Sequence, residues 1–143
     1  MSARSIVVGR PVHEVFEFFA DAENDPQWRR EVKSIHRDGP LALGARYTQR
    51  LNGPGGREIP GDLEVVALDP DSRVAFEVTA GPVRPRGEYR FRALGPDSTE
   101  VTFELDPRLT GIRKLVMGRM VDRSVAGTLA ELDRAKQVLE EAA

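Results

Sequence analysis

The sequence predicts an α+β fold, in which an antiparallel sheet of about seven strands wraps around one long C-terminal helix and two short helices follow the first strand. Three observations predict it. Apolar and polar residues alternate from about residue 32 to 105, a proline-free stretch from about 110 to 141 has apolar residues at helical spacing, and two proline-marked helix starts lie between residues 11 and 30. The 143 residues, 40% apolar and 31% charged, fit one globular domain, residues 1–143.

The first strand and the two short helices are predicted from local patterns near the N-terminus. The run from Ser2 to Val8 ends in β-branched residues, and Gly9 closes it. Pro11 suits a first helical turn because its φ is already helical and its missing N–H has no partner there. The apolar residues of this helix recur at i, i+3, i+4 and i+7: Val12, Val15, Phe16 and Phe19. Asp25 as N-cap and Pro26 as first helical residue predict the second helix.

The middle of the chain has the alternation of half-buried antiparallel strands. In the runs 47–51, 74–80, 87–93 and 101–105, every second residue is expected to lie on one face of its strand. Turn-forming residues separate the strands at 39–40, 53–56, 69–71 and 95–97. The glycine-rich run 53–56 is interpreted as a turn rather than a phosphate loop, because strand-like sequence follows it. The stretch Leu63 to Leu68 is apolar nearly throughout, which predicts a β-bulge.

The last third of the chain predicts one helix from about Thr110 to Glu141. Its apolar stripe consists of Met117, Val121, Val125, Leu129, Leu132, Ala135 and Leu139. We expect this stripe to lie on the sheet, because an isolated amphipathic helix is not stable. In its first third, apolar residues surround the helix axis: Leu109, Ile112, Leu115, Val116, Met117 and Met120. Such a segment must be covered on more than one side, or must border a cavity or a partner.

Charge and composition exclude several classes of function. The 21 basic and 23 acidic side chains leave a net charge of −2, so nucleic-acid binding and polybasic membrane anchoring are not expected. No stretch is apolar enough to cross a bilayer or to serve as a signal peptide, which predicts a cytoplasmic domain. With no cysteine and only His13 and His36 as histidines, we expect neither a metal site nor a cofactor.

Other charged residues are assigned to the surface. His13 lies off the apolar stripe of its helix and is expected to be solvated, while the orientation of His36 stays open. Four arginines at even spacing are expected to point to water: Arg84, Arg86, Arg90 and Arg92. Glutamates on neighbouring strands can neutralise them: Glu77, Glu88, Glu100 and Glu104. A solvated charged face is therefore favoured over an anion site.

Several phrases of the sequence are similar to a known family. They are RPVHEVF at 10–16, NDPQW at 24–28, GARY at 44–47, and EVV at 64–66 leading to Asp69-Pro70. With the order of elements, they resemble the START-like, or Bet v 1-like (SRPBCC), superfamily and its polyketide cyclase/dehydrase-like branch. The resemblance covers nearly the whole chain and implies a helix-grip fold. It also implies a cavity between helix and sheet for hydrophobic molecules such as sterols, lipids or polyketides.

Polar and aromatic residues on the predicted inner face point to a cavity. Tyr47 and Tyr89 each bring a hydroxyl into the interior, and Gln49 brings an amide. Burying such a group without a partner costs about 1–3 kcal/mol, whereas a cavity that holds water or a ligand accepts it. A Tyr–Gln hydrogen bond, or a slipped register that turns Gln49 outward, is the alternative. Trp28 can anchor the second helix, form a wall of the pocket mouth, or both.

The favoured hypothesis is a module that binds a small hydrophobic or amphipathic molecule, such as a lipid, polyketide or sterol-like compound. The predicted cavity residues are Trp28, Tyr47, Gln49, Phe76, Val78, Tyr89, Phe91, Met117, Met120 and Val121. The resemblance also implies a second hypothesis, an aromatase/cyclase-type enzyme in which Tyr89 or Tyr47 donates a proton. A third is an interaction domain with a closed pocket, whose patch of Leu115, Val116 and Met120 contacts a partner. A homodimer is a separate expectation, with no surface assigned to it.

Overall fold

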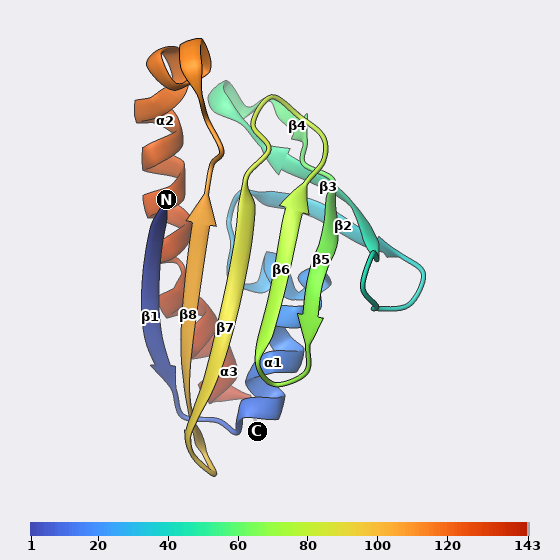
Figure 1. The fold of residues 1–143 in the computed structure, drawn as a ribbon, viewed down its shortest axis with the longest axis vertical. Helices are drawn as coiled ribbons and strands as arrows, with labels where there is room; N and C mark the ends of the chain where they lie inside the picture. Colours follow the sequence, from blue (N-terminus) through green and yellow to red (C-terminus); the bar gives the residue numbers. More distant parts are fainter. Residues whose placement is uncertain (143) are drawn as a thin grey trace.

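The computed structural model of the protein describes residues 1–142 and has the predicted α+β architecture. An eight-stranded antiparallel sheet curves in front of the helices in the view of Figure 1. In chain order the elements are β1 (Ser2–Val8), α1 (Val12–Ala20), the 3-10 helix η1 (Ala22–Gln27), β2 (Val32–Asp38), β3 (Arg46–Asn52), the 3-10 turn η2 (Pro54–Gly56), β4 (Glu58–Pro60), β5 (Leu63–Asp69), β6 (Arg73–Val78), β7 (Arg86–Gly95), β8 (Ser98–Asp106), α2 (Gly111–Ala130) and α3 (Leu132–Glu141).

The sheet has the strand order β1-β8-β7-β6-β5-β3-β2, with the short strand β4 added beside β3. The first strand pairs with the last, so that Ser2 lies opposite Leu105. The C-terminal helices α2 and α3 run behind this pair of strands, and α1 lies farther along the sheet (Figure 1). The predicted bulge is confirmed, because the register between β5 and β6 shifts between Val65 and Ala67.

The first helix is as predicted, whereas the second differs. In α1, Val15, Phe16 and Phe19 are buried against the sheet. The second segment is a 3-10 helix capped by Asp21, whose carboxylate accepts a hydrogen bond from the Glu23 backbone N–H at 3.1 Å. The prediction that Asp25 is the N-cap is therefore wrong. Asp25 lies inside the segment with its side chain buried, because its carboxylate is bound by an arginine from the following turn.

The predicted C-terminal helix is present with one interruption, at Glu131 between α2 and α3. The Glu131 carboxylate accepts a hydrogen bond from the Arg30 backbone N–H at 2.8 Å, which ties the interruption to the loop after η1. The predicted stripe is buried from Val121 to Leu139, and Met117 is half-buried. The first turns of α2 leave apolar side chains in solvent: Ile112, Leu115 and Val116 are 78%, 87% and 77% exposed.

Aromatic residues fill the core at the α1 end of the molecule. The rings of Tyr89 and Phe103 stack with their centres 4.0 Å apart, and Phe19 stacks on Tyr89 at 4.9 Å. The Trp28 ring meets Phe19 edge-on at 5.8 Å and Phe103 at 6.5 Å. Aromatic pairs in these arrangements stabilise a core beyond the area that they bury. This end of the space between sheet and helices is therefore closed.

The outer face of the sheet carries the predicted charged ladder. Arginines and glutamates pair across strands at 2.9–3.1 Å: Arg86 with Glu77, Arg90 with Glu104, and Arg92 with Glu100. Neutralisation across strands is thus confirmed for these three arginines. Arg84 is exposed in the β6–β7 loop.

Candidate functional site

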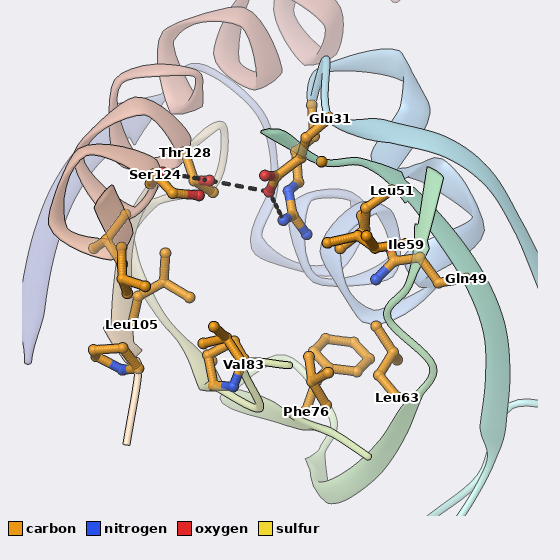
Figure 2. Close-up of a pocket in the computed structure, with 18 of the residues that line it drawn as sticks. Glu31, Gln49, Leu51, Ile59, Leu63, Phe76, Val83, Leu105, Ser124 and Thr128 are labelled. Atoms are coloured by element: carbon orange, nitrogen blue, oxygen red, sulfur yellow. Dashed lines mark hydrogen bonds and ion pairs between the residues drawn. The ribbon is translucent and has the colours of Figure 1, made fainter. Parts of the chain in front are cut away.

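A cavity of about 630 Å³ lies between α2 and the inner face of the sheet, and residues of η1 and the loop after it also contribute to its wall. Figure 2 shows the hollow with side chains from β3, β4, β5, β6 and β8 around it and α2 on one side. Most of its wall is apolar and includes Leu51, Ile59, Leu63, Phe76, Val78, Val83, Phe103, Leu105, Met117, Met120, Val121 and Val125. Its size and composition are those of a small-molecule site.

Charged and polar groups gather at one side of this cavity. Arg29 Nη1 lies 3.3 Å from Asp25 Oδ2, and its Nη2 contacts Glu31 Oε1. The Thr128 hydroxyl lies 3.3 Å from the same Glu31 oxygen and 3.1 Å from the Ser124 carbonyl oxygen. Figure 2 shows Glu31, Ser124 and Thr128 on one side of the hollow, facing Phe76 and Val83 on the other. We call Asp25, Arg29, Glu31 and Thr128 the polar cluster.

The chain around Trp28 positions this cluster. The Asp25 carbonyl accepts hydrogen bonds from the Trp28 and Arg29 backbone N–H groups at 3.0 and 2.8 Å, so Asp25 and Arg29 lie one turn apart. Arg29 Cζ lies 5.9 Å from the centre of the Trp28 ring, where a cation–π contact orients the guanidinium. The buried tryptophan therefore anchors the segment and directs Arg29 between the two carboxylates.

Asp25 is the carboxylic acid of the polar cluster whose pKa is raised. It is 5% exposed, and burial raises its pKa from 3.8 to about 6, although Arg29 lowers it; Asp21 and Glu31 add to the increase. A carboxyl group with a pKa in this range changes protonation near physiological pH, which is a property of functional sites.

Gln49 faces the cavity from β3 and is 2% exposed. Its Nε2 donates to the Gly61 carbonyl oxygen at 2.8 Å, whereas its buried Oε1 has no hydrogen-bond partner among the described residues. A Cβ atom on Gly61 would lie 2.7 Å from Leu51 Cδ1, so a larger residue there would make the Leu51 side chain shift. The interpretation of Gln49 as inward-facing is confirmed, and the outward-facing alternative is wrong.

The structure brings seven of the ten predicted residues onto the cavity wall: Gln49, Phe76, Val78, Tyr89, Met117, Met120 and Val121. Their role in binding stays a prediction. Tyr89 contributes part of its stacked ring, and burial raises the pKa of its hydroxyl well above 10.

Three predicted residues, Trp28, Tyr47 and Phe91, lie away from the cavity wall. Trp28 and Phe91 pack among the aromatic rings at the closed end. The Tyr47 hydroxyl donates to Asp21 Oδ1 at 3.1 Å and accepts from the Ala22 backbone N–H at 3.3 Å. A Tyr–Gln hydrogen bond is therefore wrong as an explanation of Gln49. The expectation that these three residues line the cavity is therefore wrong. Trp28 and Phe91 pack against other aromatic rings of the core, and Tyr47 is hydrogen-bonded to Asp21 and Ala22.

Sequence reasoning missed the polar cluster. Asp25 matched an N-cap pattern, and the charged residues Arg29 and Glu31 were indistinguishable from surface residues. Two patterns could have indicated it: the i, i+4 pairing of Asp25 with Arg29, and Thr128 beside Val125 in an otherwise apolar stripe.

Neither histidine belongs to the site. The His13 side chain is 63% exposed and lies 2.8 Å from Asp71, a hydrogen bond that, with the nearby Glu17, raises the pKa of His13 above 6.5. His36 is 78% exposed near Glu23, so it faces solvent. Within residues 1–142, no three His, Asp or Glu side chains are grouped so that they could hold a metal ion. No helix in this range is both long and apolar enough to span a membrane.

Comparison with known sequences gives one family and several relatives. Residues 2–140 match the profile of the family described as polyketide cyclase / dehydrase and lipid transport. An uncharacterised 17.2 kDa protein of Streptomyces lincolnensis is 27% identical over 139 residues, which are 96% of this chain and 87% of that protein. An uncharacterised protein of Mycobacterium tuberculosis is 28% identical over 102 residues, 68% of this chain and 59% of that protein.

Solved structures share the fold over nearly the whole chain. A START superfamily protein from Mycobacterium smegmatis superposes with a TM-score of 0.80 at 19% identity, covering 99% of this chain and 98% of that one. The Zhui aromatase/cyclase from Streptomyces sp. R1128 superposes with a TM-score of 0.74 at 19% identity, covering 97% and 92%. At this identity the likeness shows the helix-grip fold alone.

Proposed function

The chain belongs to the polyketide cyclase / dehydrase and lipid transport family, and from that premise we propose that it binds a small amphipathic molecule, such as a lipid, polyketide or sterol-like compound, in the cavity between α2 and the sheet. One observation carries the proposal: a cavity of about 630 Å³ has an apolar wall and a separate polar cluster. Burial of the ligand's apolar body supplies affinity, and the cluster orients its polar end.

The polar cluster also explains why the space exists. A close-packed core would remove the remaining solvent from the Arg29–carboxylate group and would still leave Gln49 Oε1 without a hydrogen-bond partner, and both are costly. The cavity lets a ligand or water contact the exposed parts of the Arg29 and Glu31 side chains. The side chains of Met117 and Met120 on α2 are flexible and polarisable, so they can adapt to guests of different shape.

The experiment is a binding titration with a matched pair of variants. N-phenyl-1-naphthylamine, an apolar probe that fluoresces when it leaves water, is titrated into the wild-type protein, Met117→Trp and Leu115→Trp. Met117 lines the cavity, whereas Leu115 is exposed two residues away. We expect saturable binding to the wild type, binding weakened at least about tenfold by Met117→Trp, and little change with Leu115→Trp. No saturable binding, or equal loss in both variants, contradicts the proposal.

A specific observation favours an enzyme of the aromatase/cyclase type as the second candidate. Asp25, with a pKa of about 6, lies on the same cavity wall as Tyr89, whose raised pKa keeps its hydroxyl protonated. The ionised Asp25 carboxylate can remove a proton next to a carbonyl, and Tyr89 can donate one to the developing enolate. The test is deuterium uptake at the α-carbon of 2-tetralone in D₂O. Catalysis predicts uptake above the buffer rate that Asp25→Asn abolishes.

A further inference from the structure

We propose that the polar cluster selects a ligand whose head group is an alcohol or phenol hydroxyl and rejects a carboxylate head group. This inference rests on the proposed binding function and names the class of ligand for the same cavity. It follows from two features of the wall: an excess of negative charge around Arg29, and buried atoms that a hydroxyl complements better than a carboxylate does.

The cluster already holds more anions than cations. Two carboxylates, Asp25 and Glu31, share the Arg29 guanidinium, whose side chain is 16% exposed. A ligand carboxylate would be a third anion beside one cation, in a region where poor solvation strengthens repulsion. The other cation on the wall, Arg123, is exposed on α2, so water and salt screen it.

The hydrogen-bond inventory of the wall favours a group that donates. Gln49 Nε2 and the Thr128 hydroxyl have acceptors within the protein, Gly61 O for the first and Glu31 Oε1 or Ser124 O for the second. The buried Gln49 Oε1 accepts nothing from the described residues. This oxygen has almost no surface open to the cavity, so a donor reaches it only when the Gln49 amide turns, whereas the Glu31 carboxylate, 28% exposed on the cavity wall, can accept from a ligand directly.

One buried donor is also open, and it fits the same conclusion. Arg29 Nε is buried and has no partner among residues 1–142. A hydroxyl both donates and accepts, so it can donate to the Glu31 carboxylate and can also serve Gln49 Oε1 or Arg29 Nε when those side chains turn toward it. A carboxylate only accepts, and it leaves the amide oxygen unsatisfied.

The test compares probes that share one apolar body. The three probes are 2-naphthol, 2-methoxynaphthalene and 2-naphthoate, and each displaces N-phenyl-1-naphthylamine from the wild-type protein near neutral pH. We expect 2-naphthol to bind about tenfold more tightly than 2-methoxynaphthalene, which cannot donate a hydrogen bond. We expect 2-naphthoate to bind most weakly of the three. If 2-naphthoate binds as well as 2-naphthol, the inference is overturned while the binding function stands. If none of the probes binds, both fail.

Charge removal within the cluster gives a second readout. Glu31→Gln keeps the acceptor oxygen and removes one negative charge, so 2-naphthoate should bind about tenfold more tightly than it does to wild type, with 2-naphthol little changed. Asp25→Asn should act in the same direction, which covers the case that Glu31→Gln folds poorly. The matched control is Glu100→Gln, because Glu100 pairs with Arg92 on the outer face of the sheet. Unchanged discrimination in both cluster variants, or an equal effect of Glu100→Gln, contradicts the inference.

Discussion

The two halves of the C-terminal helical region differ in how they meet the sheet. From Val121 to Leu139 the apolar stripe is buried, and Leu132 and Ala135 are fully inaccessible. Between Gly111 and Met120 no side chain is fully buried, and Met117 and Met120 face the cavity instead. The second half therefore packs into the core, with Val121, Val125 and Thr128 also reaching the cavity, whereas the first half meets the sheet only across the cavity. Stability and ligand binding should thus respond to substitutions in different places.

The largest difference is expected between core and cavity positions on the helices. Leu132→Ala removes a fully buried side chain from the closed half and should cost about 2–5 kcal/mol of unfolding free energy. Met117→Ala, at the cavity, should cost less, about 1 kcal/mol, because its side chain is only partly buried and borders the cavity. Urea unfolding of both variants measures this. Equal losses would show that the two halves pack alike.

The next largest effect is expected for substitution of Asp25, which should raise the free energy of unfolding rather than lower it. Its pKa is raised from 3.8 unfolded to about 6 folded, so the folded protein binds its proton more tightly, and stability from this group falls as pH rises from about 4 to 6. Asp25→Asn should therefore stabilise the protein by about 2–3 kcal/mol near pH 7.5, with the gain disappearing below about pH 4. Urea unfolding across this pH range is the measurement. A loss of stability at pH 7.5 would contradict it.

A smaller effect is expected at Tyr47 on β3, where stability should change but probe affinity should not. Tyr47→Phe removes the hydrogen bonds with Asp21 and Ala22, and should cost about 1 kcal/mol while probe affinity stays unchanged, because Tyr47 lies off the cavity wall. The same titration and unfolding series reports both quantities. A marked change in probe affinity would show that Tyr47 takes part in binding and would contradict this prediction.

The smallest change in stability is expected at the exposed apolar surface of α2. Leu115 is 87% exposed, so Leu115→Glu should alter unfolding free energy by less than about 0.5 kcal/mol. The patch of Leu115, Val116 and Met120 is also the surface predicted to contact a partner in the third hypothesis. Size-exclusion chromatography with light scattering tests the separate homodimer prediction: a wild-type dimer that Leu115→Glu leaves intact agrees with the small change in stability, and a wild-type monomer contradicts the homodimer prediction.

The sequence predicted the fold because periodicity is a property of whole segments. Alternation in the middle of the chain and the stripe from Val121 to Leu139 required the sheet and helix that are observed. In the first third of the helix, apolar residues occur on all sides of the axis. This pattern also indicated that Met117 and Met120 border a cavity or a partner.

The polar cluster could not be predicted in this way. Asp25, Arg29 and Glu31 come from an irregular segment between α1 and β2, where no periodicity assigns a face. Whether a charged residue there faces water or a cavity depends on how Trp28 seats the segment, which is a tertiary contact. The prediction that Tyr47 lines the cavity was wrong for a related reason. Its inward orientation was predicted, but its hydrogen-bond partners Asp21 and Ala22 are distant in sequence.

The most direct test of a ligand held between α2 and the sheet uses the three methionines of the chain. Met117 and Met120 line the cavity, whereas Met1 is 82% exposed at the N-terminus and serves as an internal reference. In protein labelled with ¹³C at the methionine methyl groups, saturation with 2-naphthol should shift the NMR signals of Met117 and Met120 and leave Met1 in place. Signals of Met117 and Met120 that do not move, or that move no more than Met1, would contradict the account.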